Sequence, residues 1–383
     1  MKIVADANIP LLAEAFSPLG EVVALPAEQI VPAVLAQAQA LLVRSVTPVG
    51  PALLDGTPVR FVATATIGID HVDTAYLESR GIGFASAQGS NARSVAEYVL
   101  AAMAVLAARQ GVRMTEQVLG IVGVGNVGGR LARMAEAIGM RVLRNDPPLA
   151  RRTGDRAYLS FDDLAQADVV TFHVPLARDG PDATYHMIDA ALVARLKPGV
   201  TLINTSRGAV ADTEALKAAI DAGRLGTVVL DVWEGEPNID PALLARVDLA
   251  TPHIAGYSYD GKVNGTRMVL EALCGHFGLA RPWDPSPRMP PPAHPRVALP
   301  AGLGVDMAIG RAVAAAYDME ADDRRLRGML GEPPAARGRY FAALRREYPV
   351  RREFPETTVE LAAHDPAVEA ALAALGFPVR VAP

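Results

Sequence analysis

Short apolar runs rich in β-branched residues alternate with Ala-rich stretches of helical spacing up to about residue 255. This rhythm of strand, helix and strand predicts parallel sheets joined by right-handed crossovers. The runs form two groups, which predicts an α/β protein with two doubly wound lobes. The expected strands are Lys2–Asp6, Glu21–Leu25, Ala40–Ser45, Arg60–Thr66 and Ile82–Ala87 in the first lobe, and Val118–Val124, Arg141–Asp146, Asp168–Val174, Thr201–Thr205, Thr227–Val232 and Asp248–Thr251 in the second.

A nearly uncharged stretch, Ala92–Gln110, separates the two groups of strands. Its only charges before Arg109 are Arg93 and Glu97. A helix that is apolar on nearly all faces is usually buried between other elements. We therefore expect this helix to join the two lobes.

A proline-rich segment follows the second lobe, with eight prolines in residues 281–300. Such a segment continues neither a helix nor a central strand, so it predicts a domain boundary. Beyond it, Gly302–Met319 is Ala-rich and apolar on one side, while Thr357–Ala362 and Phe377–Val381 have strand character. We expect a small α+β domain at the C-terminus.

Composition excludes several classes of protein. The 383 residues carry a net charge of -5, which gives no basic surface for nucleic acid. The single cysteine, Cys274, permits neither a disulfide framework nor a cysteine-ligated metal site. The longest strongly apolar stretch, Tyr98–Ala108, is shorter than the roughly 20 residues of a membrane span, and Lys2 and Asp6 leave no signal-peptide core. We expect a soluble, cytoplasmic protein without a metal and without nucleic-acid or membrane partners.

A glycine loop, Gly123-Val-Gly125-Asn126-Val127-Gly128, lies between an expected strand and an expected helix. Gly-x-Gly-x-x-Gly alone is a weak signal, but this context makes it typical of a dinucleotide site. Gly123 permits the tight turn, Gly125 lets a pyrophosphate approach the backbone, and Gly128 lets helix and strand pack closely. The first N–H groups of the helix then face the phosphates.

Asp146 ends the next expected strand, eighteen residues after Gly128. A carboxylate at this point accepts hydrogen bonds from both ribose hydroxyls and repels the 2′-phosphate of NADP. The sequence therefore predicts NAD. The neighbouring Arg144 leaves NADP open as an alternative.

Polar residues follow several strands of the second lobe, where ligands of open α/β sheets bind. Oxidation of a 2-hydroxy acid needs a base near neutral pH, a carboxylate beside it and an arginine for the substrate carboxylate. His253, Glu236 and Arg207 can fill these roles. Spacing alone favours His253 only slightly over His173, which also ends a strand.

Four motifs together resemble the D-isomer-specific 2-hydroxyacid dehydrogenase family. They are Gly123–Gly128, Asn204-Thr-Ser-Arg-Gly-Ala-Val, Asp231-Val-Trp-Glu-Gly-Glu-Pro and Thr251-Pro-His-Ile-Ala-Gly. The resemblance implies a flavodoxin-like substrate lobe (residues 1–95 and 256–282) into which a Rossmann NAD lobe (96–255) is inserted. It also implies the catalytic trio Arg207, Glu236 and His253.

The same resemblance implies further site residues. Substrate contacts fall on Ser45, Thr66 and Tyr257. NAD contacts fall on Gly123, Gly125, Asn126, Val127, Gly128, Asp146, Val174, Thr205, Ser206, Asp231 and Gly256. Three positions depart from the family pattern: Val174 stands where threonine is usual, and Gln88 and Ser90 replace a proline and a cysteine.

The C-terminal residues resemble one branch of the family, in which this domain (residues 283–383) forms a homodimer and the substrate is a small phosphorylated 2-hydroxy acid. Arg44, Ser45 and the backbone of residues 66–68 are candidate phosphate donors. Arg351 or Arg352 either reaches the partner's cleft or, as we favour, belongs to a solvated basic turn. Two alternatives stay open: a dehydrogenase of 3-phosphoglycerate or of another D-2-hydroxy acid, and a non-catalytic NAD-sensing protein like a corepressor. The presence of all three residues of the trio favours an enzyme.

Overall fold

The computed structural model describes residues 1–280 and 282–382. By their contacts the residues form two compact units, Met1–Asn91 with Ser258–Pro290, and Ala92–Tyr257 with Pro291–Pro383. The C-terminal residues thus belong to the same unit as the second α/β lobe. The functional domain boundaries expected near residues 95, 255 and 282 stay a proposal.

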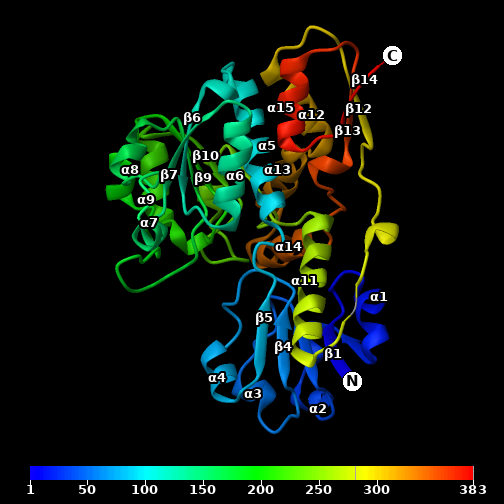
Figure 1. Ribbon diagram of the computed structural model, residues 1–383. Coiled ribbons are helices and arrows are strands. Elements are labelled where there is room, and N and C mark those ends of the chain that lie inside the picture. The colour runs from blue at the N-terminus through cyan, green and yellow to red at the C-terminus, as the bar shows by residue number, and fades with distance from the viewer. Residues whose placement is uncertain (281, 383) are drawn as a thin grey trace. The chain divides into compact units, whose positions relative to one another are not determined.

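The first unit has a five-stranded parallel sheet in the order β2-β1-β3-β4-β5, which is the flavodoxin-like order (Figure 1). Ile3 and Ala5 face a cluster with α1 and α11, whereas Val4 faces a cluster with α2, α3 and α4. Helices cover both faces, so most residues in the middle of the strands are apolar. The elements are β1 (Lys2–Asp6), α1 (Leu12–Phe16), β2 (Glu21–Leu25), α2 (Pro32–Leu35), β3 (Ala40–Val43), α3 (Pro51–Leu54), β4 (Phe61–Thr64), α4 (Thr74–Ser79), β5 (Gly83–Ser86) and α11 (Tyr259–Phe277).

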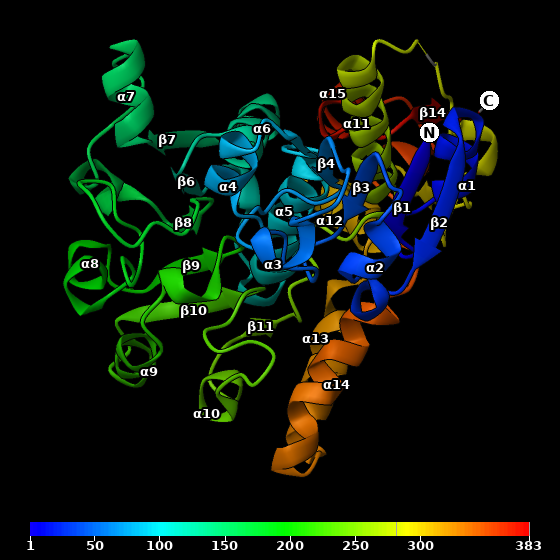
Figure 2. The same cartoon turned by 90° about the horizontal axis from the view of Figure 1, so that it is seen from below.

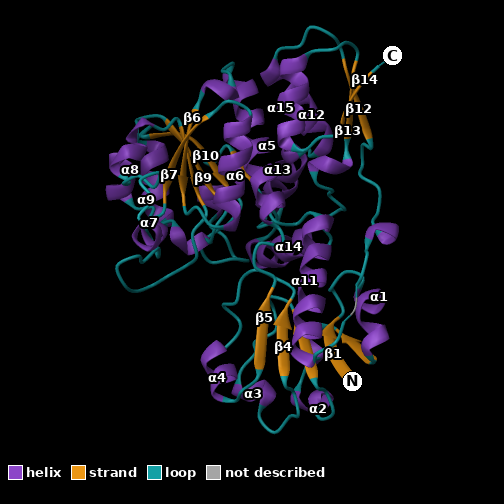
Figure 3. Ribbon diagram, viewed as in Figure 1, coloured by secondary structure: helices purple, strands orange, loops and turns teal. Residues whose placement is uncertain are grey.

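The second unit contains a six-stranded parallel sheet in the order β11-β10-β9-β8-β6-β7, whose strands are orange in Figure 3. Because β7 and β8 lie on opposite sides of β6, the winding direction reverses there, and ligands bind beyond the strand ends at such a point. The elements are β6 (Val118–Val122), α6 (Asn126–Ala137), β7 (Arg141–Asn145), α7 (Pro147–Thr153), β8 (Val169–Phe172), α8 (Ala190–Arg195), β9 (Val200–Asn204), α9 (Thr213–Asp221), β10 (Leu225–Leu230), α10 (Pro241–Leu244) and β11 (Leu249–Ala250).

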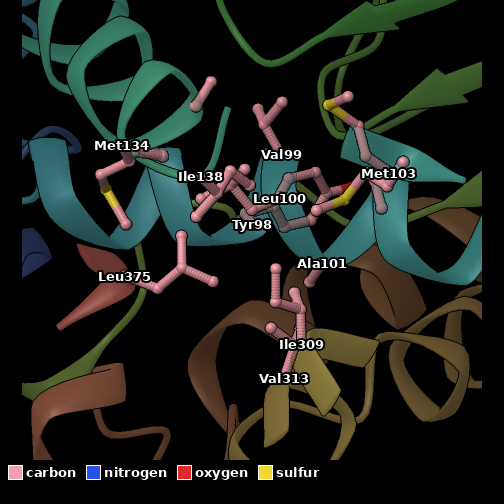
Figure 4. Close-up of a cluster of buried hydrophobic side chains, with 14 of the residues drawn as sticks. Tyr98, Val99, Leu100, Ala101, Met103, Met134, Ile138, Ile309, Val313 and Leu375 are labelled. Atoms are coloured by element: carbon pink, nitrogen blue, oxygen red, sulfur yellow. The ribbon is translucent and has the colours of Figure 1, made fainter. Parts of the chain in front are cut away.

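Helix α5 (Ala92–Gln110) has the expected bounds and is buried along most of its length. It is part of the second unit, where it packs against α6 and against α12 (Val305–Ala316). Helix α15 (Pro366–Leu375) packs against the same two helices. Helix α5 therefore joins the six-stranded sheet to the C-terminal helices. Figure 4 shows this core, with side chains from α5, α6, α12 and α15: Tyr98, Val99, Leu100, Ala101, Met103, Met134, Ile138, Ile309, Val313 and Leu375.

The C-terminal residues form a three-stranded sheet in the order β12-β13-β14, and both strand pairs are parallel. The sequence did not predict β12, which lies inside the proline-rich segment. It is an edge strand, and Pro295 and Pro300 lie just outside its two ends. The elements are β12 (Arg296–Leu299), α12 (Val305–Ala316), α13 (Met319–Arg327), α14 (Pro334–Arg346), β13 (Thr358–Leu361), α15 (Pro366–Leu375) and β14 (Val379–Val381).

Helix α13 covers the short edge strand β11 of the six-stranded sheet (Figure 2). Asp323 accepts a hydrogen bond from the Ala250 N–H at 2.8 Å. Arg327 donates to the carbonyls of Leu244 and Val247 at 3.0 and 2.7 Å. An uncovered edge would leave unpaired backbone groups, so the C-terminal helices complete this sheet.

None of the helices in the described part of the chain is both long and apolar enough to cross a membrane. Within the same residues, no group of three or more His, Cys, Asp or Glu side chains is arranged to hold a metal ion.

We expect the substitution Leu372→Ala on α15 to lower the free energy of unfolding by about 2–5 kcal/mol, because a fully buried leucine leaves a cavity. Leu372 is 0% exposed and belongs to the core around α5. Urea unfolding followed by circular dichroism measures the loss. The control is Leu330→Ala at a position that is 37% exposed, with an expected effect within about 0.5 kcal/mol. Equal losses in the two variants would contradict the packing of α15 described above.

Candidate active site

The glycine loop joins β6 to α6 at the point where the sheet reverses its winding. Gly123 has a φ of 85°, and a Cβ there would lie 2.5 Å from the His173 carbonyl oxygen. A Cβ on Gly128 would overlap the Gly123 carbonyl oxygen, whereas Gly125 faces open space. Asn126 and Val127 begin α6, whose cap residue Gly125 offers no side-chain acceptor. The first N–H groups of α6 are thus available to an anion.

Asp146 connects the glycine loop to the next strand. Its carboxylate accepts hydrogen bonds from the Val124 N–H at 2.8 Å and from the Leu149 N–H at 2.9 Å. Arg144, the residue that left NADP open, pairs with Glu136 of α6 at 2.6 Å. The cation next to Asp146 is therefore already paired with a carboxylate, which favours NAD over NADP.

The structure distinguishes the two candidate histidines. His173 is bonded through both ring nitrogens, to the hydroxyls of Thr171 and Thr205, each at 3.0 Å. Burial lowers the pKa of His173 to about 3, so the ring is neutral at physiological pH. A ring with both nitrogens occupied is a poor proton acceptor for a substrate. Val174 follows it, and its side chain lies beside Gly123.

His253 lies next to Glu236, with 2.8 Å between Nδ1 and Oε2. Its side chain is 33% exposed, so Nε2 is the nitrogen left for a substrate. The other oxygen of Glu236 accepts from the Trp233 N–H at 2.7 Å. Burial opposes ionisation of Glu236, but the hydrogen bond and charge of His253 outweigh it and lower the pKa of Glu236. The pair can hold the imidazole in one orientation and stabilise its protonated form.

Asp231 fixes the backbone on both sides of His253. Its buried carboxylate accepts from the Thr251 hydroxyl at 2.6 Å and from the N–H groups of Ile254 and Ala255 at 2.7 and 3.0 Å. Burial raises the pKa of Asp231, and these hydrogen bonds and the charge of His253 counter the rise. These contacts all stabilise the loop, so the expected contact of Asp231 with NAD stays a prediction.

Arg207 follows β9 and lies beside the turn that carries Glu236. A Cβ on Gly208 would overlap the Trp233 carbonyl group, which shows how closely the two turns approach. Buried Asn204 closes the Arg207 turn by accepting from the Ser206 N–H and hydroxyl at 3.0 and 2.6 Å. The structure therefore brings the turns of Arg207, Glu236 and His253 together at adjacent strand ends.

Arg351 is a functional neighbour that the sequence misassigned. We expected it, with Arg352, to lie in a solvated turn or at a partner's cleft. Both are buried, at 9% and 7% exposure. Arg351 donates to the Ala255 carbonyl and the Ser94 hydroxyl at 2.6 Å each, and to the Ile254 carbonyl at 3.3 Å. Arg352 pairs with Glu356.

The loop after His253 continues to Gly256 and Tyr257, and the Tyr257 N–H donates to the Ile254 carbonyl at 2.9 Å. The Tyr257 hydroxyl accepts from Arg345 of α14 at 3.0 Å. The sequence predicted Tyr257 as a substrate contact but missed Arg345. No local signal distinguishes Arg345 from the other arginines of its helix.

In the first unit, Ser45 and Thr66 follow the neighbouring strands β3 and β4. Ser45 is exposed, and the Thr66 hydroxyl is hydrogen-bonded to that of Thr64 at 2.7 Å. Of the two departures in the next loop, Gln88 is exposed, while Ser90 is buried and its carbonyl accepts from Asn264 at 2.9 Å. The assignment of Ser45 and Thr66 to the substrate stays a prediction.

Comparison with known proteins identifies the family of this chain. Residues 91–255 match the NAD-binding domain of the D-isomer-specific 2-hydroxyacid dehydrogenases. The chain is 51% identical to an erythronate-4-phosphate dehydrogenase of Salinibacter ruber over 94% of both chains. It is 45% identical to that of Marinobacter nauticus over the full length of both. The chain belongs to the D-isomer-specific 2-hydroxyacid dehydrogenase family.

Membership in this family confirms the expected α/β fold, NAD as the cofactor and an NAD-dependent oxidoreductase acting on a CH–OH group. A solved glyoxylate reductase from Paecilomyes thermophila is 26% identical, with a TM-score of 0.57, and the match covers 75% of this chain and 99% of that one. Residues 288–376 match a domain of unknown function (DUF3410). The dehydrogenase thus has an additional C-terminal domain.

We expect Asp146→Asn to reduce the preference of the dehydrogenase for NAD over NADP by ~10-fold or more, because the charge that repels the 2′-phosphate is lost. Asparagine still caps α7, so the fold is retained. The ratio of kcat/KM for the two cofactors measures the change. Asp189→Asn, at the equivalent cap of α8, is the matched control and leaves the ratio unaltered. An unchanged ratio in Asp146→Asn would show that Asp146 does not select the cofactor.

Proposed function

We propose that this chain oxidises the 2-hydroxyl of 4-phospho-D-erythronate to (R)-3-hydroxy-2-oxo-4-phosphooxybutanoate, with NAD as hydride acceptor, in the biosynthesis of pyridoxine 5′-phosphate. The observation that supports this type of reaction is the pair of His253 and Glu236 beside the Arg207 turn, with 2.8 Å between Nδ1 and Oε2. The substrate is supported by relatives of 45–51% identity over nearly the whole chain that bear the name erythronate-4-phosphate dehydrogenase.

In the proposed reaction, NAD supplies the site with its hydride acceptor. His253 takes the proton of the 2-hydroxyl at Nε2, and Glu236 stabilises the imidazolium that forms. Arg207 grips the substrate carboxylate and polarises the new carbonyl group through its planar fork of donors. Ser45, Thr66 and Tyr257 are the proposed substrate contacts. Val174, Thr205, Ser206, Asp231 and Gly256 are the proposed cofactor contacts besides the glycine loop and Asp146.

We also infer a cytoplasmic homodimer formed through the C-terminal domain. Large apolar side chains on the surface of this domain support the dimer, among them Met307 at 56% and Val350 at 49% exposure. The lone cysteine, Cys274, is buried and fits a reducing compartment. Sedimentation equilibrium tests the dimer. A measured mass equal to that of one chain, 40.3 kDa, would refute it.

A comparison of acids tests the substrate. We expect kcat/KM for 4-phospho-D-erythronate to exceed that for 3-phospho-D-glycerate by ~10²-fold or more, because one misfitted carbon displaces the phosphate from its donors. Single-turnover formation of NADH avoids any limit from cofactor release. Faster oxidation of phosphoglycerate would overturn the substrate assignment in favour of the second phosphorylated acid.

We expect His253→Ala to lower kcat by ~10²–10⁴-fold, which is the usual contribution of a general base, while NAD binding is retained. Steady-state kinetics and fluorescence titration with NADH measure the two effects. The control is His364→Ala, a histidine whose side chain is 69% exposed and paired with Glu369. A His253→Ala enzyme with most of its activity would refute the proposed base. If the wild-type protein binds NADH but oxidises none of the tested acids, that result would instead support the corepressor-like alternative.

A further inference from the structure

Arg345 of α14 is a cation beside the candidate active site that the reaction described above does not use. It belongs to the matched C-terminal domain, residues 288–376. Its guanidinium donates to the Tyr257 hydroxyl at 3.0 Å and lies over the Tyr257 ring, 5.6 Å from the ring centre. Tyr257 is four residues beyond His253 in the same loop. Arg345 is therefore attached to the loop that carries the base.

The charge of Arg345 also reaches the catalytic carboxylate. It contributes to lowering the pKa of Glu236, after the larger effects of burial, His253 and the Trp233 N–H. Yet Arg345 makes no ion pair: among the described residues, neither Glu236 nor any other carboxylate has an oxygen within 4.0 Å of its guanidinium nitrogens. The side chain is thus close enough to act on charges at the site but has no anion of its own.

The Nε of Arg345 is buried without a hydrogen-bond partner in the described residues. A buried donor of a charged group that lacks an acceptor costs free energy, so such a group in a native fold needs an explanation. Arg346 on the same helix and Arg325 on α13 differ in this respect, because the first pairs with Glu347 and the second with Asp322. An anionic ligand would supply the missing acceptor.

The chemistry of the proposed substrate provides such an anion. A 2-hydroxy acid phosphorylated at its far end carries a carboxylate and a phosphate, and one arginine cannot bind both. The phosphate therefore needs donors besides Arg207, and Arg44 and Ser45 were expected among them. Arg207 is assigned to the carboxylate. Arginine matches phosphate geometry well because its planar donors bind two oxygens at once.

We propose that Arg345 binds the phosphate group of the substrate, with Tyr257 holding the guanidinium in place, and so makes the C-terminal domain the determinant of specificity for phosphorylated acids. This inference rests on the proposed function.

The test compares Arg345→Met and Arg345→Lys with Arg346→Met, the matched control on the same helix, whose side chain is 68% exposed. The acids are 4-phospho-D-erythronate and D-erythronate, at saturating NAD. We expect Arg345→Met to lower kcat/KM for the phosphorylated acid by ~10²–10³-fold, the loss of two charge-assisted hydrogen bonds. The value for D-erythronate and the KM for NAD should stay within ~3-fold of the wild type. Arg345→Lys should lie in between, because it keeps the charge but loses the fork.

Equal losses for the two acids would overturn the proposal, because they would mean that Arg345 only positions Tyr257 and His253. A rise in KM for NAD without a loss specific to the phosphorylated acid would overturn it in favour of a cofactor phosphate. No loss for either acid would also overturn it. Thermal unfolding of each variant shows whether the comparison is made on folded protein, and Arg345→Lys serves as the second variant if Arg345→Met is unstable.

Binding of inorganic phosphate to the NAD-loaded protein, followed by calorimetry, separates this inference from the proposed function. We expect weaker phosphate binding in Arg345→Met and unchanged binding in Arg346→Met. That result would support the phosphate site even if the wild type oxidised another phosphorylated acid. Equal phosphate binding by the wild type and Arg345→Met would refute the site whatever the substrate.

Discussion

The site depends on the buried carboxylate of Asp231, which holds the loop that carries His253. Backbone donors on a loop would otherwise bond to water, and a histidine on such a loop would have no fixed direction. Asp231 gathers Thr251, Ile254 and Ala255 around one charge. His253 itself has a φ of 58°, a conformation that non-glycine residues rarely adopt. The strain is held by contacts on both sides of the residue, so Nδ1 points at Glu236 and Nε2 is left for chemistry.

The C-terminal domain contributes to the same loop from the other direction. Asp231 accepts hydrogen bonds from the N–H groups of the residues after His253, and Arg351 donates hydrogen bonds to their carbonyl groups. Arg351 is itself held over the ring of Tyr317, at 4.4 Å from the ring centre. Helix α5 continues this connection, because Ser94 donates to the Ala255 carbonyl and accepts from Arg351. The domain thus stabilises the His253 loop, covers the sheet edge at β11 and packs on α5 within one compact unit.

Much of this architecture can be predicted from the sequence because it depends on residues that are close together in the chain. A parallel strand covered on both faces is a short apolar run, and all eleven strands of the two large sheets were predicted to within a few residues. The glycine loop was predicted because its glycine spacing and its place between a strand and a helix are both features of consecutive residues. The strand β12 was missed because Pro295 and Pro300 stand directly before and after its four residues, and such prolines indicate a break in regular structure.

By itself, then, the sequence determined the two doubly wound lobes, the dinucleotide loop and the strand ends at which polar residues gather. Spacing favoured His253 over His173 only slightly, since both follow strands of one sheet, and the assignment of His253 rested on the family resemblance. The tertiary structure separates the two histidines by burying His173 between two threonine hydroxyls and pairing His253 with Glu236. It also placed Arg351 and Arg345, about a hundred residues further along the chain, beside the His253 loop. Long-range contacts of this kind depend on how whole helices pack, and no spacing within the sequence records them.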